Sequence, residues 1–142
     1  MANVIPFSFR GELFTGTHNF ASGGDSFKLA LYTANPYTTA STVYSSTTEV
    51  SSAGSSNYTT TGNTLSGNAV AASTAVASCD FDDTQWTSAT FTAAFGAIYN
   101  DDQSDKLCVV LDFDGDKTAT NGTFKISFPN PATPADAIIS MA

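Results

Sequence analysis

The segment from Phe91 to Phe128 constrains the fold more than any other part of the sequence. It holds three runs rich in aromatic and β-branched residues, at 91–99, 106–113 and 123–128, with polar residues between them. Runs of this kind, bounded by Asn, Asp, Ser and Gly, are typical of consecutive antiparallel strands. The middle run contains residues 107–111, which are continuously apolar and predict a central strand. The segment therefore predicts three strands joined by two turns.

Other segments extend this pattern. Residues 25–33 alternate apolar and polar side chains, as a half-buried strand does. Residues 69–79 predict one long strand or two short ones, and residues 137–141 predict a last strand. Residues 38–64 are rich in Ser and Thr and predict an irregular connection along the surface. Because no long helical pattern interrupts these strands, the chain predicts an all-β fold, an antiparallel β-sandwich, with a jelly roll as one form of it.

The first 20 residues differ from the rest of the chain. At 142 residues the chain is expected to form one domain, with residues 1–20 as an N-terminal arm or helical lead-in and 21–142 as the β-sandwich. Residues 8–14 fit one or two helical turns, with Ser8 as the N-cap. This segment either covers one open end of the sandwich or docks on a neighbouring subunit. The second alternative makes six apolar residues a candidate subunit interface: Ile5, Pro6, Phe7, Phe9, Leu13 and Phe14.

The composition argues against two classes of partner. The formal net charge is -8, and the five basic residues are scattered along the sequence. An acidic body repels phosphate groups, so neither nucleic acid nor an anionic membrane is an expected partner. No apolar run approaches the roughly 18 residues of a membrane span, and the N-terminus lacks the pattern of a secretion signal. We therefore expect the chain to leave its compartment of synthesis only as part of an assembled particle.

The sharpest candidate for a binding site is the acidic stretch that follows the middle run. Asp112, Asp114 and Asp116 alternate along the chain and could offer oxygen ligands to Ca²⁺, which takes about six to eight of them. An EF-hand loop that began at Asp112 would need Gly at its sixth position and an acidic residue at its twelfth. This chain has Lys117 and Thr123 at those positions, so the EF-hand interpretation fails. A solvated acidic turn is the alternative, and no other cofactor is expected.

No residue set in the sequence predicts catalysis. His18 is the only histidine and is expected at the surface or at a helix cap. Cys79 and Cys108 are the only cysteines, and we expect two free, buried thiols, with a disulfide as the alternative. One histidine and two distant cysteines do not make a zinc site, and the Gly-x-Ser-x-Gly motif is absent. The sequence therefore predicts a protein that is not an enzyme.

Six short segments are similar to a known group of proteins. They are MANVIP (1–6), GELFTGTHNF (11–20), FKLALYT (27–33), GAIYN (96–100), VLDFDGDK (110–117) and NGTF (121–124). Together they resemble small structural proteins that tailed bacteriophages encode among their virion genes. The similarity covers most of the chain, is thin across residues 38–64, and lies in strand and turn patterns. It therefore implies a virion component and supplies no catalytic residue.

The resemblance implies a protein made in the host cytoplasm and located in the virion. One expectation is a capsid decoration or cement protein that forms a homo-oligomer and binds other virion proteins, such as the major capsid protein. A second is a tail, collar or fibre component that contacts a host glycan or another virion protein. A third, from a different class, is a carbohydrate-binding module, against which the missing secretion signal argues. We favour the decoration protein.

Overall fold

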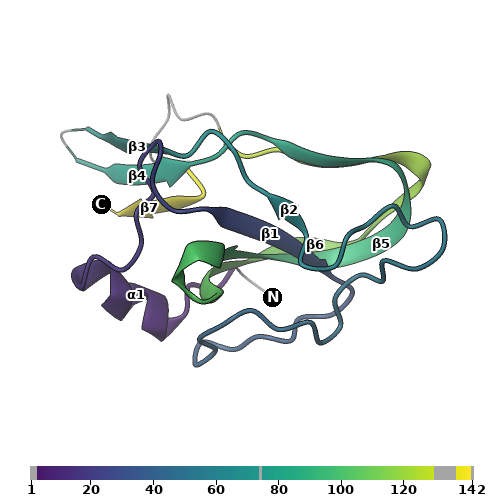
Figure 1. Cartoon of the computed structure of the whole chain (residues 1–142), viewed down its shortest axis with the longest axis horizontal. Helices are drawn as coiled ribbons and strands as arrows, with labels where there is room; N and C mark the ends of the chain where they lie inside the picture. Colours follow the sequence, from purple (N-terminus) through teal and green to yellow (C-terminus); the bar gives the residue numbers. More distant parts are fainter. Residues whose placement is uncertain (1–2, 74, 130–136, 142) are drawn as a thin grey trace.

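The computed structural model describes residues 3–73, 75–129 and 137–141. Figure 1 shows the arrangement of the elements in space. In chain order they are α1 (Phe7–Phe14), β1 (Phe27–Tyr32), β2 (Asn63–Thr64), β3 (Ala69–Ala72), β4 (Ala77–Asp80), β5 (Thr84–Asn100), the 3₁₀ helix η1 (Asp101–Gln103), β6 (Lys106–Ile126) and β7 (Ile139–Met141).

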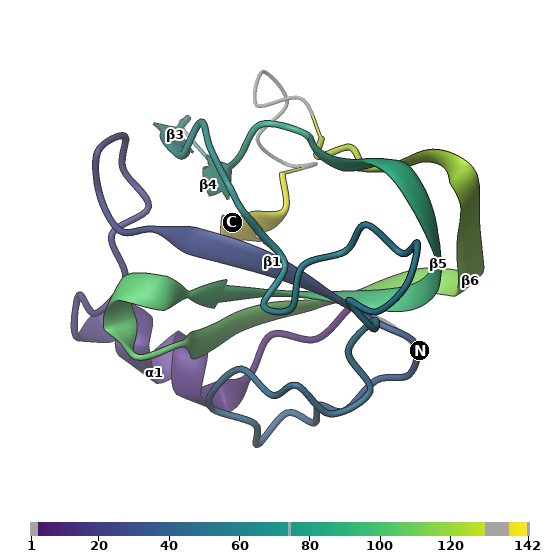
Figure 2. The same cartoon turned by 45° about the vertical axis from the view of Figure 1, so that its right-hand side comes forward.

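The strands form two antiparallel sheets, and the predicted all-β sandwich is confirmed. The larger sheet has the order β2-β1-β5-β6, and the smaller sheet has the order β3-β4-β7. Of the two alternatives predicted for residues 69–79, one long strand or two short ones, the structure has two short strands, β3 and β4, which pair as a hairpin. Three pairs of consecutive strands are neighbours, β1–β2, β3–β4 and β5–β6, whereas β1 pairs with β5 and β4 with β7 across the sequence, and we describe the topology by this order rather than as a jelly roll. Figures 1 and 2 show the smaller sheet lying across the larger one, with α1 beside it.

The prediction of three strands between Phe91 and Phe128 is wrong, because β5 and β6 form one long hairpin. Its two strands pair from Thr84 and Ile126 at one end to Asn100 and Lys106 at the other. The predicted second turn is a bulge within β6, where Asp114 and Gly115 adopt positive φ angles of 56° and 99°. A bulge bends a strand and increases its twist, while pairing resumes beyond it. Figure 2 shows the hairpin curling so that its far half lies above its near half.

This curl forms part of the core between the two layers. The Phe124 ring, from the far half of β6, lies 6.4 Å from Phe113 in the near half, measured between ring centroids. On the other side it lies 4.9 Å from Phe91 and 6.2 Å from Trp86, both from β5. One hairpin thus contributes aromatic rings to the core from both layers.

Two other predictions about the larger sheet need correction. β1 is buried on both faces rather than half-buried, because Ala30 and Tyr32 pack in a second apolar cluster opposite the main core. β6 is an edge strand rather than a central one. Its apolar run is nevertheless buried, because backbone bridges place Val4 against Val110 and Val43 against Lys106. Segments with almost no regular structure therefore cover this edge.

The Ser- and Thr-rich segment 38–64 is irregular, as predicted, and Glu49 holds it in place. The carboxylate of Glu49 accepts hydrogen bonds from the hydroxyl groups of Tyr44 (2.5 Å) and Tyr58 (2.7 Å) and from the backbone N–H of Thr61 (2.8 Å). The Tyr58 hydroxyl also accepts a hydrogen bond from the backbone N–H of Leu31 in β1 (3.0 Å). The segment is thus fixed to the sheet by tyrosine hydroxyl groups rather than by long strands.

Candidate functional site

The helix α1 divides the six predicted interface residues into two groups. It spans the predicted segment, but Pro6 rather than Ser8 occupies the N-cap, and no side chain caps the helix there. Phe9 is buried with 1% exposure, and Pro6 is also buried. Ile5 and Leu13 pack partly against the core, whereas Phe7 and Phe14 are 60% and 95% exposed. The inner face of α1 therefore belongs to the core, while its outer residues are open to a partner.

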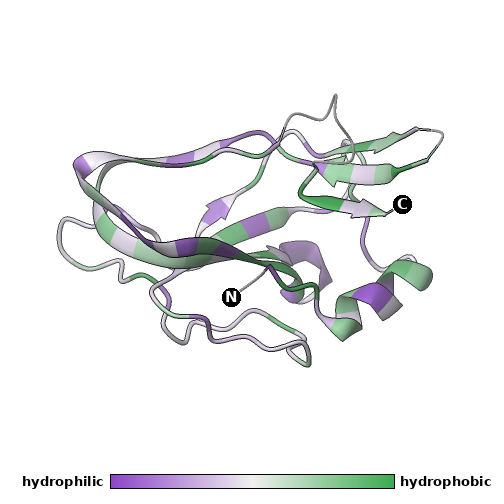
Figure 3. Ribbon diagram, turned by 180° about the vertical axis from the view of Figure 1, so that it is seen from behind, coloured by the Kyte–Doolittle hydropathy of each residue, from purple (hydrophilic) through white to green (hydrophobic). Residues whose placement is uncertain are grey.

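A groove runs between α1 and the edge strand β7, and we call it the α1–β7 groove. Its volume is about 460 Å³. Arg10 lies at this groove, with its guanidinium 5.4 Å from the centre of the Phe7 ring. Figure 3 shows α1 beside β7, with hydrophobic residues coloured green on both elements. Six apolar residues line the groove: Ile5, Phe9, Leu13, Phe14, Ile139 and Met141.

His18 lies at the centre of a buried polar network, so the prediction of an exposed or capping histidine is wrong. Its side chain is fully buried, with Nε2 2.8 Å from the Glu12 carboxylate. Its Nδ1 is 2.9 Å from the side-chain nitrogen of Asn100. A neutral ring that carries its proton on Nε2 satisfies both contacts. The network continues through Lys106, which pairs with Glu12 at 2.8 Å, and Asp25, which accepts a hydrogen bond from Asn100 at 2.8 Å.

Cys108 lies next to this network, and the combination of Cys, His and Asn invites comparison with a thiol hydrolase. The Cys108 sulfur is 4.0 Å from His18 Nδ1. However, Cys108 is completely buried, and burial raises its thiol pKa well above the ordinary value. The reactive species of cysteine is the thiolate, and a substrate must reach it. Both cysteines are free and buried, as predicted.

The network predicts a loss of stability in acid. Burial alone would raise the pKa of Glu12, but hydrogen bonds from Lys106 and His18 outweigh it and hold that pKa below its ordinary value. A lowered folded-state pKa stabilises the protein above the unfolded-state pKa, and this contribution disappears as the pH falls through the folded-state value. We therefore expect the urea midpoint to fall between pH 5 and pH 3, and to fall less in a Glu12→Gln variant. As a control, Asp116→Asn changes an exposed carboxylate and should leave the pH dependence of the urea midpoint as in the wild type. If Glu12→Gln also kept the wild-type pH dependence, the loss of stability in acid could not be assigned to Glu12.

The three aspartates of the predicted cation site do not come together. The backbone N–H of Asp114 donates to the Asp112 carboxylate at 2.9 Å, which closes a local turn within the bulge. Asp114 and Asp116 are exposed. Within the part of the chain that the structure describes, no group of three or more His, Cys, Asp or Glu side chains is placed to hold a metal ion. The Lys117 amino group lies 3.5 Å from the backbone carbonyl of Asp114.

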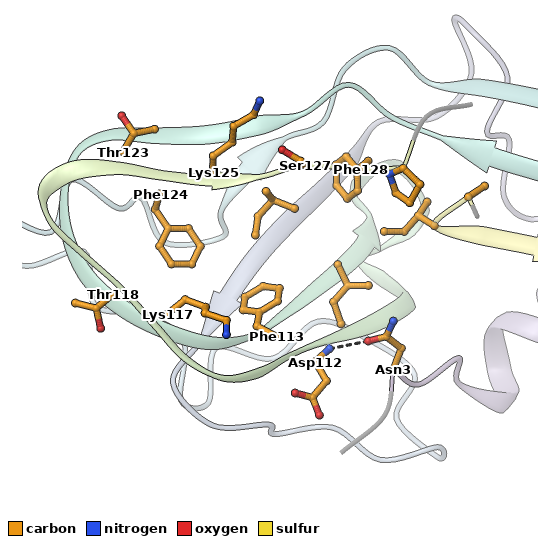
Figure 4. A pocket seen from close by; sticks show the side chains of 15 residues that line it. Asn3, Asp112, Phe113, Lys117, Thr118, Thr123, Phe124, Lys125, Ser127 and Phe128 are labelled. Atoms are coloured by element: carbon orange, nitrogen blue, oxygen red, sulfur yellow. Dashed lines mark hydrogen bonds between the residues drawn. The ribbon is translucent and has the colours of Figure 1, made fainter. Parts of the chain in front are cut away.

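A second cavity, which we call the β6 cleft, was missed by the sequence interpretation. It has a volume of about 700 Å³ and lies inside the curl of β6 (Figure 4). Phe113, Phe124 and Phe128 line it, with Lys117 and Asn3 among its polar residues. The alternation of apolar residues at 124, 126 and 128 does mark one face of a strand, but it does not reveal that this face is partly open. The opening of this face results from the bend that the bulge introduces into β6.

Comparisons with protein-family models, with curated proteins and with solved structures found no match to the chain. In the described ranges, no helix is long and apolar enough to cross a membrane. The α1–β7 groove and the β6 cleft are the two surface features from which we infer a function below.

Proposed function

We propose that this protein is a non-enzymatic structural subunit that assembles with copies of itself through the α1–β7 groove. The observation that carries the proposal is the exposure of Phe14, at 95%, across the groove from Met141, at 58%. An exposed phenylalanine costs solubility and stabilises nothing in an isolated chain. Contiguous apolar patches on soluble proteins commonly mark interaction sites. A surface of this kind supports a role in assembly.

The charges around the groove are compatible with a second copy as partner. Arg10 makes no ion pair with any residue that the structure describes; its side chain reaches only the backbone carbonyl of Ile5 at 3.4 Å and the ring of Phe7. A second copy carries 13 acidic side chains and thus offers carboxylates to this guanidinium. Opposite charges at the rim of an apolar contact favour association in a defined orientation.

The setting that we propose is the virion of a tailed bacteriophage. The resemblance of six segments to phage structural proteins supports this part of the proposal, and the low proportion of charged residues, 13%, suits a subunit with a large packed surface. In this proposal the chain is a decoration or cement protein of the capsid, and the major capsid protein is its second partner. The complete burial of the Cys108 thiol beside His18 suits a structural role for this pair.

Light scattering of the purified protein tests self-assembly. We expect the wild type to form a closed oligomer and a Phe14→Ser/Met141→Ser variant to have the mass of the monomer, because two exposed apolar residues leave the groove. Val43→Ser removes another exposed apolar residue, of 47% exposure, from outside the groove and should leave the mass unchanged. A wild type that remains a monomer at the highest soluble concentration would contradict the proposal, as would an equal effect of all the substitutions.

A further inference from the structure

We propose that the β6 cleft binds an acidic sugar, a pyranose ring that carries a carboxylate. This inference is independent of self-assembly through the α1–β7 groove, since the two cavities share no lining residue. The volume of the cleft, about 700 Å³, lies within the roughly 300–1,000 Å³ that is usual for small-ligand sites.

The aromatic residues of the cleft provide a rigid apolar wall. Phe113 and Phe128 are half-buried, so each ring packs on the protein and keeps part of its surface open. Phe124 behind them is fixed by Phe91 and Trp86, at centroid distances of 4.9 and 6.2 Å. Figure 4 shows the rings of Phe113 and Phe124 turned toward the space between the two halves of β6. The C–H-rich face of a pyranose ring can pack on such rings.

Three charged residues line the cleft, namely Lys117, Lys125 and Asp112, and of these Lys117 favours a carboxylate as ligand. Lys28, Lys106 and Lys125 are each paired with a carboxylate, at 3.0, 2.8 and 2.8 Å. Lys117 forms no ion pair with the described residues, and its closest polar contact is the Asp114 carbonyl at 3.5 Å. Figure 4 shows its side chain extending toward Phe113. An ammonium group that forms no ion pair with the described residues and lies beside apolar side chains favours an anionic ligand over a neutral one at this position, although the chain as a whole carries a net charge of -8.

The polar residues at the rim favour a hydroxylated ligand over an aliphatic or aromatic acid. The Asn3 side-chain oxygen accepts a hydrogen bond from the backbone N–H of Asp112 at 2.8 Å (Figure 4). This contact uses the amide oxygen, so the two N–H groups of the Asn3 side chain remain available as donors to a ligand. Thr123 is an exposed residue that also lines the cleft, although Figure 4 shows its side chain turned away from the rings of Phe113 and Phe124. An acid without hydroxyl groups would cover these polar groups without replacing their bonds to water, which costs affinity.

The single tryptophan offers a direct test, because Trp86 contacts Phe124 at the back of the cleft. The probes are glucuronate, glucose and benzoate, titrated while Trp86 fluorescence and backbone amide chemical shifts are recorded. We expect saturable binding of glucuronate with shifts confined to Asn3 and to residues 111–128 and 137–138, and binding of glucose and benzoate that is weaker by about tenfold or more. The amide shifts report binding even where the fluorescence does not change.

Substitution of the cleft lysine completes the test. Lys117→Gln should weaken glucuronate binding about tenfold and leave the affinity for glucose unchanged, since a charge-assisted hydrogen bond is lost. Arg10→Gln removes the cation of the other groove and should leave glucuronate binding as in the wild type. Equal affinities for glucuronate and glucose, or tighter binding of benzoate, would overturn the proposal. A Lys117→Gln variant with the wild-type affinity for glucuronate, or the absence of amide shifts near the cleft, would overturn it as well. The Phe14→Ser/Met141→Ser variant should bind glucuronate normally, which separates this site from assembly.

Discussion

The Phe9→Ala variant is expected to lose about 3–5 kcal/mol of its free energy of unfolding, the usual cost of removing a fully buried phenylalanine. Phe9 is 1% exposed, and its ring centroid lies 5.0 Å from the His18 ring and 6.0 Å from the Phe20 ring. Truncation to alanine leaves a cavity beneath α1 and removes the apolar cover of the polar network at His18. Urea unfolding, followed by circular dichroism and extrapolated to zero denaturant, measures this loss.

The matched control is Phe14→Ala, on the same helix and with the same change of side chain. Phe14 is 95% exposed, so we expect its truncation to change the free energy of unfolding by no more than about 0.5 kcal/mol. Assembly through Phe14 would add apparent stability at high protein concentration, so both variants should be compared over a dilution series. Similar losses in the two variants would contradict the placement of α1.

A deletion of the N-terminal segment distinguishes its two interpretations, a cover for the core and an arm that docks on a neighbouring subunit. A segment that only docks on a neighbour can be removed without loss of the fold. In this structure α1 supplies Phe9 to the core and Glu12 to the ion pair with Lys106, so removal of residues 4–14 is expected to unfold or strongly destabilise the domain. The helix therefore acts as a cover through its inner face, and in our proposal its outer residues form the interface.

Much of the fold could be predicted from local patterns because strands leave a period of two in the sequence. The alternation predicts the first strand, whereas the strands at residues 69–79 are predicted from interspersed Ser and Thr residues and from the absence of charged residues. The Asp114-Gly115 pair was misread, since the same residues that favour a turn also tolerate the positive φ angles of a bulge. Only the partner strand distinguishes the two outcomes. Here Lys117 and Thr118 resume pairing with Ala93 and Thr92.

The polar network could not be predicted from sequence because it joins residues that are distant along the chain. Glu12 and Lys106 are separated by 94 positions and His18 and Asn100 by 82. Each lies in a different segment of the sequence, and no local pattern connects them. Distant contacts also explain why the apolar run of β6 predicts a central strand although β6 lies at an edge. The run is buried at this edge because Val4 and the irregular segment around Val43 cover it. Long-range contacts of this kind leave no local signal.

The second large effect is expected at Gly62, where Gly62→Ala should cost about 3 kcal/mol or more, or prevent folding, because a methyl group has no space there. An added Cβ would lie 1.9 Å from the backbone oxygen of Leu29 and 2.7 Å from the Cα of Ala30. Both contacts are with the backbone of β1, which is buried and paired on either side by β2 and β5, so it cannot shift easily. The φ angle of +77° adds strain for any residue that has a Cβ.

Gly54→Ala separates this clash from the conformational strain. Gly54 lies in the same irregular segment with a φ angle of +68°, but an added Cβ would meet nothing within 4 Å. We expect this control to lose only about 1–2 kcal/mol, the cost of placing an L-residue in the left-handed region. The difference between the two variants in urea unfolding then measures how closely segment 38–64 is packed against β1. Equal losses would mean that the segment can move away from the sheet, in which case the hydrogen bonds of Glu49, rather than close packing, would be what holds it.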